Sequence, residues 1–210
     1  MKTRVAFLFW FQIVAAWVYA VPQAYAIASG KTEGLTLVLY AMFMVYSAFS
    51  FFLAIASYKI NKDSERRGTI FVFAQWIVFN GVLFCLGLRT IPWKTGDTIV
   101  CIAVLILLAA TIVWYRGLKD PFSKGFMAVW CRAIPHTWLA YTMLMFGKAD
   151  SLPIPTLIAS HCTSLTRLAQ VWISGKSGGW DRPTKGLLIG ELANVITWMV
   201  VTAIWVTKLF

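Results

Sequence analysis

VPQAYAIASGKTEGL, residues 21–35, is the stretch that decides the fold expected for this chain. It closes the first apolar run and turns into the second. Pro22 has no backbone N–H, and its ring crowds the preceding helical turn, so a membrane helix that contains it is kinked unless neighbouring groups satisfy the freed carbonyl. We therefore predict a hinge at Pro22 and the adjacent Gln23.

A similar phrase returns in the second half of the chain as AIPHTWLAYTMLMFGKADSL, residues 133–152. Pro135 stands in place of Pro22, His136 in place of Gln23, and GKADSL in place of GKTEGL. The sequence therefore indicates an internal repeat, with a second hinge at Pro135.

The composition is that of a membrane protein. Of the 210 residues, 60% are hydrophobic and 13% are charged, whereas charged residues make up about a quarter of a soluble domain. About twenty apolar residues suffice for a helix to cross a hydrocarbon core of about 30 Å. We predict seven such spans, at residues 5–27, 36–58, 69–88, 97–115, 124–146, 153–174 and 186–207.

The fourth predicted span is almost without polar residues, and it separates the two copies of the repeat. Three helices carry the chain to the opposite side of a membrane, so one additional crossing lets a second triplet run parallel to the first. We therefore predict an all-α integral membrane protein made of two three-helix bundles, residues 1–90 and 121–210, joined by a linker helix in residues 91–120.

The amino terminus also has features of a secretory signal, because Lys2 and Arg4 precede an apolar segment that ends in Ala24-Tyr25-Ala26. The same segment carries the phrase that is repeated around Pro135. We therefore expect it to be the first span.

The net charge of +11 is expected to reflect basic cytoplasmic loops and not nucleic-acid binding, since lysine and arginine concentrate on the cytoplasmic side of membrane proteins. The amino-terminal side of the predicted topology has twelve basic residues: Lys2, Arg4, Lys59, Lys62, Arg66, Arg67, Arg116, Lys119, Lys124, Lys176, Arg182 and Lys185. The opposite side has five: Lys31, Arg89, Lys94, Lys148 and Lys208. We expect a cytoplasmic amino terminus and a location in the cell (inner) membrane.

Asparagines lie in the middle of the third and seventh predicted spans. Asn80 follows Trp76 by four residues, and Asn194 precedes Trp198 by four, so each asparagine shares a helix face with a tryptophan. A buried amide without partners is costly in a membrane. Each asparagine is therefore expected either to bond a neighbouring helix or to face water and a ligand.

Ionisable residues also occur inside the predicted spans. Arg132 and His136 are four residues apart, Arg167 lies on the polar face of the sixth span, and Glu191 is in the seventh. Such residues rarely face lipid. Arg132 either snorkels to the membrane edge or faces the interior, and Glu191 needs Arg132, Arg167, a shared proton or water as its partner.

The sequence favours neither an enzyme nor a metal or cofactor protein. It contains no HExxH, GxSxG or paired carboxylates. The four cysteines all lie in predicted spans without CxxC spacing, so we interpret them as small apolar side chains.

The repeated proline phrase, its GK turn, and an asparagine in the third helix of each triplet resemble the PQ-loop superfamily and, within it, the seven-span SWEET sugar transporters. The resemblance covers nearly the whole chain. It implies that Asn80 and Asn194 contact the substrate near the midplane, and that Pro22 and Pro135 are hinges for alternating access.

The chain departs from that family in three respects. His136 replaces the usual glutamine, the second predicted span has no proline, and the predicted orientation is opposite to that usual in SWEETs. The added positive charge of Arg132, His136 and Arg167 is not required by a neutral sugar. The sequence therefore predicts a carrier for a small polar solute with an anionic group, or for a zwitterion, in the lipid bilayer.

In this carrier, Asn80 and Asn194 hydrogen-bond the solute and Trp76 and Trp198 stack against it. The sequence leaves open the coupling ion and the oligomeric state, a homo-oligomer included. The alternative is a sorting or peptide receptor similar to the KDEL receptors, which share the seven-span plan and hold a peptide carboxylate with intramembrane arginines.

Overall fold

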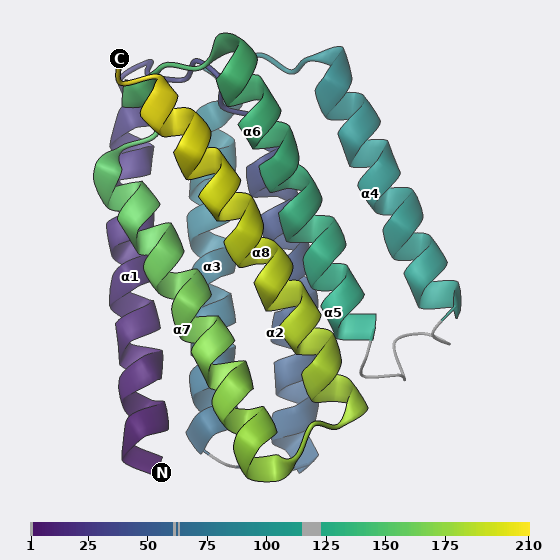
Figure 1. The fold of residues 1–210 in the computed structure, drawn as a ribbon. Helices are drawn as coiled ribbons and strands as arrows, with labels where there is room; N and C mark the ends of the chain where they lie inside the picture. The colour runs from purple at the N-terminus through teal and green to yellow at the C-terminus, as the bar shows by residue number, and fades with distance from the viewer. Residues whose placement is uncertain (1, 61, 63, 115–122) are drawn as a thin grey trace.

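The computed structural model describes residues 2–60, 62, 64–114 and 123–210, and over these residues the fold is entirely helical (Figure 1). The elements in chain order are α1 (Lys2–Ala28), α2 (Leu37–Ile60), α3 (Ser64–Gly87), α4 (Thr95–Trp114), α5 (Ser123–Ala128), η1 (Val129–Ala133), α6 (Ile134–Phe146), η2 (Ala149–Ser151), α7 (Ile154–Gly178) and α8 (Arg182–Thr207). The amino and carboxyl termini lie at opposite ends of the long helices.

Five helices of the described chain, α1, α2, α3, α4 and α8, are long and apolar enough to cross a membrane. The prediction of a helical membrane protein is therefore confirmed at this level. The predicted fifth and sixth spans do not meet the same measure. The fifth is divided into α5, η1 and α6, and α7 is more polar than the others, with Arg167 and Gln170 in its second half.

The division of the predicted fifth span has a local cause in Pro135. A proline inside a helix clashes with the carbonyl four residues earlier, which here belongs to Cys131. The five residues before Ile134 form a wider π turn, and the Ile134 N–H donates to the Val129 carbonyl. This turn accommodates the proline without ending the helix, and π turns of this kind occur frequently at functional sites.

The predicted hinge at Pro22 lies inside an unbroken helix, since α1 continues from Lys2 to Ala28. The helix ends where the GK phrase begins, and Gly30 adopts a φ of 77°, a left-handed conformation that glycine tolerates. The two prolines of the repeat are therefore accommodated differently, Pro22 within an α-helix and Pro135 directly after a π turn.

The long helices pack as two groups of three with the third helix of each group in the middle. In the first group α3 packs against both α1 and α2, and in the second α8 packs against both α7 and the α5–η1–α6 segment. The groups meet where α1 packs on α7 and where α2 packs on η1 and α6. The first helix of each group thus contacts the second helix of the other.

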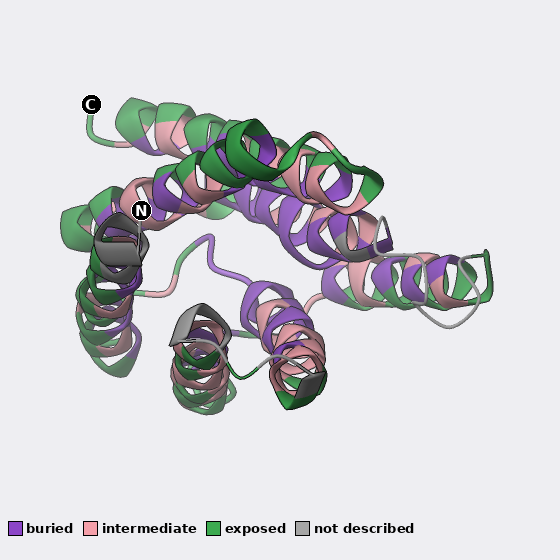
Figure 2. Ribbon diagram, turned by 90° about the horizontal axis from the view of Figure 1, so that it is seen from below, coloured by how far each residue is buried: buried purple, intermediate pink, exposed green. Residues whose placement is uncertain are grey.

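Helix α4 lies at the edge of this arrangement (Figures 1 and 2). Only Asp97, Val104, Leu108 and Thr111 of its residues are buried. Asp97 attaches its first turn to both groups, because Oδ1 accepts hydrogen bonds from Thr36 Oγ1 of the segment before α2 and from Trp138 Nε1 of α6, each at 2.7 Å. One carboxylate therefore attaches the start of α4 to both groups, and a hydrogen bond from Trp130 Nε1 to Thr111 Oγ1 joins its second half to η1.

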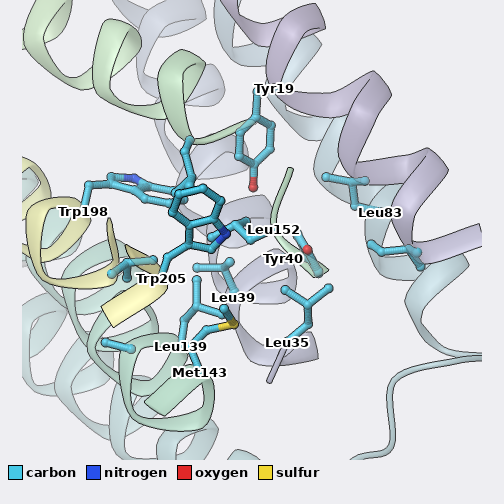
Figure 3. Packing of buried hydrophobic residues seen from close by; sticks show 14 of the residues in the cluster. Tyr19, Leu35, Leu39, Tyr40, Leu83, Leu139, Met143, Leu152, Trp198 and Trp205 are labelled. Atoms are coloured by element: carbon cyan, nitrogen blue, oxygen red, sulfur yellow. The ribbon is translucent and has the colours of Figure 1, made fainter. Parts of the chain in front are cut away.

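The main apolar core joins both groups near the end where the chain terminates. Figure 3 shows aromatic and aliphatic side chains from α1, α2, α3, α6 and α8 converging there, among them Tyr19, Leu83, Leu139, Trp198 and Trp205. A second buried cluster joins α2, α3, α4, α5 and η1 and includes Met42, Phe73, Leu108 and Met127. Burial of the first cluster closes the end of the helix assembly where the chain terminates.

Helices α5 and α8 approach each other through glycines. A Cβ placed on Gly125 would overlap the Gly186 carbonyl, and a Cβ on Gly190 would lie 2.8 Å from the Cβ of Ala128. Small residues allow this close approach of backbones in membrane helices. The GLLIG segment of α8, residues 186–190, is therefore a helix-packing surface.

Replacing Gly125 with alanine is expected to destabilise the protein by about 1–3 kcal/mol, because the backbone at the crossing must move apart. The measurement is the apparent free energy of unfolding in detergent micelles. Gly178→Ala is the matched control, since nothing lies within 4 Å of a Cβ at that position. Equal stability of the two variants would contradict the close crossing.

Candidate functional site

A buried charge cluster connects the π turn, α7 and α8. Arg132 Nη1 lies 3.0 and 3.1 Å from the two carboxylate oxygens of Glu191, and Arg167 Nε lies 3.7 Å from Glu191 Oε1. Glu191 is 1% exposed. The sequence left the partner of Glu191 open. In the structure Glu191 contacts both arginines, and its contact with Arg132 is the closer one.

The cluster continues through side-chain amides into α1. Arg167 Nη1 donates to Gln170 Oε1 at 3.1 Å, and the same oxygen accepts a hydrogen bond from Gln12 Nε2 at 2.9 Å. Gln12 is itself buried. Polar side chains therefore link the two groups of helices through α7 and α1.

A cavity of about 60 Å³ lies beside this cluster. The residues that line it are Gln12, Tyr19, Phe43, Tyr46, Ser47, Val72, Phe73, Trp76, Arg132, Ser160, Thr163, Ser164, Arg167, Asn194 and Trp198. They come from both groups of helices. The wall combines guanidinium and hydroxyl groups with aromatic rings.

The two predicted asparagines differ in their relation to this cavity. Asn194 lines it, and its Nδ2 donates to Ser164 Oγ at 2.6 Å, whereas its Oδ1 has no partner among the described residues. Asn80 is 1% exposed and donates to the carbonyl of Trp76 in its own helix, and it is not a lining residue. Only one of the two amides thus reaches the cavity in this conformation.

Both predicted tryptophans line the cavity, Trp76 from α3 and Trp198 from α8. Trp76 packs edge to face against Tyr19, with ring centroids 5.3 Å apart. Trp198 packs against His136 at 4.5 Å. Each indole is therefore packed against another aromatic ring, and each also forms part of the cavity wall.

His136 is completely buried directly beyond that wall. Its ring contacts Phe43 and Trp198, with centroids 5.1 and 4.5 Å away, and neither ring nitrogen has a hydrogen-bond partner in the described part of the chain. Both neighbours line the cavity, but His136 does not. In this conformation it is a packing residue behind the cavity.

A second cavity, of about 190 Å³, lies next to the first and shares Tyr46, Phe73 and Arg167 with it. Its other lining residues are Phe49, Ser50, Leu53, Ala54, Ser57, Thr69, Met127 and Leu187. Most of these positions belong to the second half of α2 and the first half of α3, toward the end of the molecule where the amino terminus lies (Figure 1), and Met127 and Leu187 belong to α5 and to the first half of α8. The two cavities therefore extend from the charge cluster toward that end.

The opposite end is closed by the two copies of the repeated phrase. Lys31 lies 3.7 Å from Asp150, and Lys148 lies 2.9 Å from Glu33, so each copy supplies the lysine of one ion pair and the acid of the other. Hydrogen bonding to Lys148 holds the pKa of Glu33 below its usual value, and Glu33 raises the pKa of Lys148. The reciprocal pairing indicates an approximate two-fold relation.

Buried hydrogen bonds repeat this reciprocity beneath the ion pairs. Gln23 Nε2 donates to the Ser151 carbonyl at 3.1 Å, and Thr142 Oγ1 donates to the Gly34 carbonyl at 2.7 Å. Gly34 and Ser151 occupy the same place in GKTEGL and GKADSL. Gln23 therefore connects α1 to the other copy of the repeat and does not reach the cavity.

Sequence reasoning did not single out Gln12 and Tyr46. Gln12 lies in the first half of the first span, away from the proline phrase, and Tyr46 was hidden in an aromatic-rich segment. The cost of burying an amide in a membrane was a usable signal for Gln12. No local pattern singles out Tyr46, because its role depends on Arg132, whose guanidinium carbon lies 5.2 Å from the centre of its ring.

The fold and the site define a helical membrane protein that encloses a charged and aromatic cavity between two groups of three helices. No protein-family model, no curated protein and no solved structure matches the chain.

Proposed function

We propose that the protein is a carrier that moves a small polar solute, anionic or zwitterionic, across a membrane by alternating access. In this proposal seven helices cross the membrane as two triplets, residues 1–90 and 121–210, with α4 as the linker, as the resemblance to the PQ-loop superfamily implies. The observation that carries the proposal is the cavity between the triplets, which contains Arg132, Arg167 and Asn194.

The lengths and outer faces of the remaining two helical segments support seven crossings. Ser123–Phe146 and Ile154–Gly178 contain 24 and 25 helical residues, or about 36 Å of helix each. In α7 the polar Thr156, Ser160 and Ser164 are buried, while large apolar residues such as Ile158 and Leu165 are exposed. A helix with its polar face inside and its apolar face outside is suited to the edge of a membrane bundle.

The contacts between the triplets support a rocking motion of one against the other. Carriers built from repeats alternate their access by such a motion around a central site. Here the end with the repeated phrases is closed by reciprocal contacts, and the cavities extend toward the other end. Opening the closed end requires separation of Lys31 from Asp150 and of Lys148 from Glu33.

The predicted roles of the individual residues remain part of this proposal. Pro22 and Pro135 act as hinges, Asn194 hydrogen-bonds the solute, and Asn80 does so in a conformation in which it reaches the cavity. The excess of lysine and arginine on the amino-terminal side supports a cytoplasmic amino terminus in a cell membrane. The conformation described is then open toward the cytoplasm.

Solute counterflow in proteoliposomes tests this function. Vesicles are loaded with a mixture of unlabelled small carboxylates, amino acids and hexoses, and uptake of each labelled solute is measured. Asn194→Ala is expected to lower the uptake at least about tenfold, because a hydrogen bond realised in the site is lost. Ile196→Ala is the matched control, since Ile196 is 58% exposed on the outer face of the same helix.

Two outcomes oppose the proposal. Counterflow that is absent for every solute class would remove the carrier function, and unchanged uptake by both Asn194→Ala and Asn80→Ala would remove the site assignment. Saturable peptide binding without solute flux would instead support the receptor alternative, in which Arg132 and Arg167 hold a peptide carboxylate.

A further inference from the structure

We infer that the cavity selects solutes by charge number: it accepts one carboxylate on a small monoanion, Arg167 binds that carboxylate, and Glu191 limits the charge accepted to one. This inference rests on the proposed function and specifies its substrate class. It is carried by the composition of the charge cluster and by the unequal contacts that the two arginines make with Glu191.

The charge of the site is the first step. Arg132 and Arg167 line the cavity, whereas Glu191 lies behind them and is not a lining residue. Neither cavity is lined by an acidic residue within the described chain. Two guanidinium groups and one carboxylate leave one positive charge, and an uncompensated charge in a membrane interior is costly. One carboxylate of the solute neutralises this positive charge, whereas a dianion would leave the site with a net negative charge.

The two arginines are not equally available to a solute. Arg132 contacts both oxygens of Glu191 within 3.1 Å, and its side chain is 9% exposed. Arg167 has one contact with Glu191 at 3.7 Å, beyond ordinary hydrogen-bond distance, and its side chain is 23% exposed. Arg167 also lines both cavities. A carboxylate arriving from the larger cavity therefore meets Arg167 first.

The remaining wall of the smaller cavity limits the rest of the solute. Asn194 and Arg132 line the cavity, and Asn194 Oδ1 and Arg132 Nε are buried without a hydrogen-bond partner among the described residues. Phe43, Phe73 and Trp198 supply apolar surface. The smaller cavity has a volume of about 60 Å³ and adjoins the larger one of about 190 Å³, so the two together suit a short carboxylate with an apolar or singly hydroxylated chain.

Three three-carbon probes of similar size separate the charge states. Propionamide is neutral, propionate has one negative charge, and malonate has two at pH 7.5. Their dissociation constants are measured from ligand-dependent thermal shifts of the full-length protein in micelles at constant ionic strength. Propionate is expected to bind the unmodified protein at least about tenfold more tightly than either of the others, the difference that 1.4 kcal/mol confers.

Two substitutions test the roles of the charged residues. Arg167→Gln leaves the closer pair of Arg132 and Glu191 in place and is expected to weaken propionate binding at least about tenfold. Glu191→Gln adds one positive charge to the site and is expected to shift the preference from propionate to malonate. Ile196→Ala, on the outer face of α8, is the control expected to bind all three probes as the unmodified protein does.

The inference is overturned if malonate or propionamide binds the unmodified protein as tightly as propionate, if none of the three binds, or if Arg167→Gln binds propionate unchanged. The last result decides the matter even where Glu191→Gln does not fold. Counterflow of a hexose or an amino acid by the same protein would then leave the carrier function intact and remove only the charge selection.

Discussion

Glu191→Ala is expected to lower the apparent free energy of unfolding by about 3–5 kcal/mol, the usual cost of removing one partner from a buried ion pair. The substitution leaves Arg132 without the two carboxylate oxygens that lie 3.0 and 3.1 Å from its Nη1. Because Arg132 lies in the π turn that precedes Pro135, loss of its carboxylate partner also affects the helix that contains the predicted hinge. The measurement is reversible unfolding in mixed micelles.

A double variant separates the cost of an unpaired charge from the contribution of the pair itself. Replacing a buried pair with apolar residues of similar volume is often neutral or stabilising. Arg132→Met combined with Glu191→Leu is therefore expected to recover most of the stability lost in Glu191→Ala, yet to transport poorly. Leu192→Ala controls for loss of side-chain volume on α8, since Leu192 is 41% exposed.

A double variant as unstable as Glu191→Ala would contradict this explanation, because the instability would then come from lost packing or from Arg167 and not from an unpaired Arg132. A stable double variant that transports normally would show that the pair of Arg132 and Glu191 has a structural role only. The two measurements together therefore distinguish the stability of the cluster from its function.

The helices were accessible to prediction because apolar length is a local property of the sequence. The predicted first span at 5–27 lies within α1, and the predicted fourth at 97–115 corresponds to α4. The π turn before Pro135 was not predicted. Its cause is local, but a proline in a membrane helix is compatible with a kink, a π turn or an unbroken helix, as Pro22 demonstrates.

The sequence was sufficient to name residues of the site, but it did not predict how they are arranged in space. Arg132, Arg167 and Glu191 stood out because ionisable groups are rare inside membranes, but their pairing depends on how α7 and α8 pack. Asn80 and Asn194 looked equivalent in the sequence. In the structure Asn194 has Ser164 as a partner across helices, whereas Asn80 bonds its own helix, so only one reaches the cavity.

The repeated phrase predicts the approximate two-fold relation between the halves more directly than it predicts the hinges. GKTEGL and GKADSL have the same order of lysine, acid and leucine, which predicts similar local structure in each half. That each lysine pairs with the acid of the other copy follows only when the two copies face each other. Exposed pairs of this kind contribute little to stability. In the proposed carrier, such weak pairs suit a contact that opens during transport.

Asp97→Ala is expected to be the second substitution with a large effect, because one buried carboxylate holds α4 against both triplets. Thr36 Oγ1 and Trp138 Nε1 each lie 2.7 Å from Asp97 Oδ1, and the Lys94 N–H lies 2.8 Å from Oδ2. A hydrogen bond to a charged group contributes about 1.5–3 kcal/mol. We expect a loss of at least about 3 kcal/mol in the apparent free energy of unfolding.

The bond to the Lys94 N–H is part of a helix amino-terminal cap, since an acidic residue three positions into a helix reaches back to the capping residue. Asp97→Asn keeps one oxygen as acceptor for Trp138 or Thr36 and is expected to lose less than Asp97→Ala. Thr98→Ala is the matched control on the same turn, because Thr98 is exposed and its hydroxyl accepts a hydrogen bond from Trp93 Nε1.

The position of α4 is a more specific measure than stability. A spin-label pair on exposed residues of α4 and α6, Ile106→Cys and Leu144→Cys in a background without native cysteines, reports their separation. Asp97→Ala is expected to broaden the distance distribution, since two of the three lost bonds join α4 to other elements. An unchanged distribution, together with unchanged stability, would show that the apolar contacts of Val104 and Leu108 and the hydrogen bond from Trp130 to Thr111 suffice to hold the linker helix.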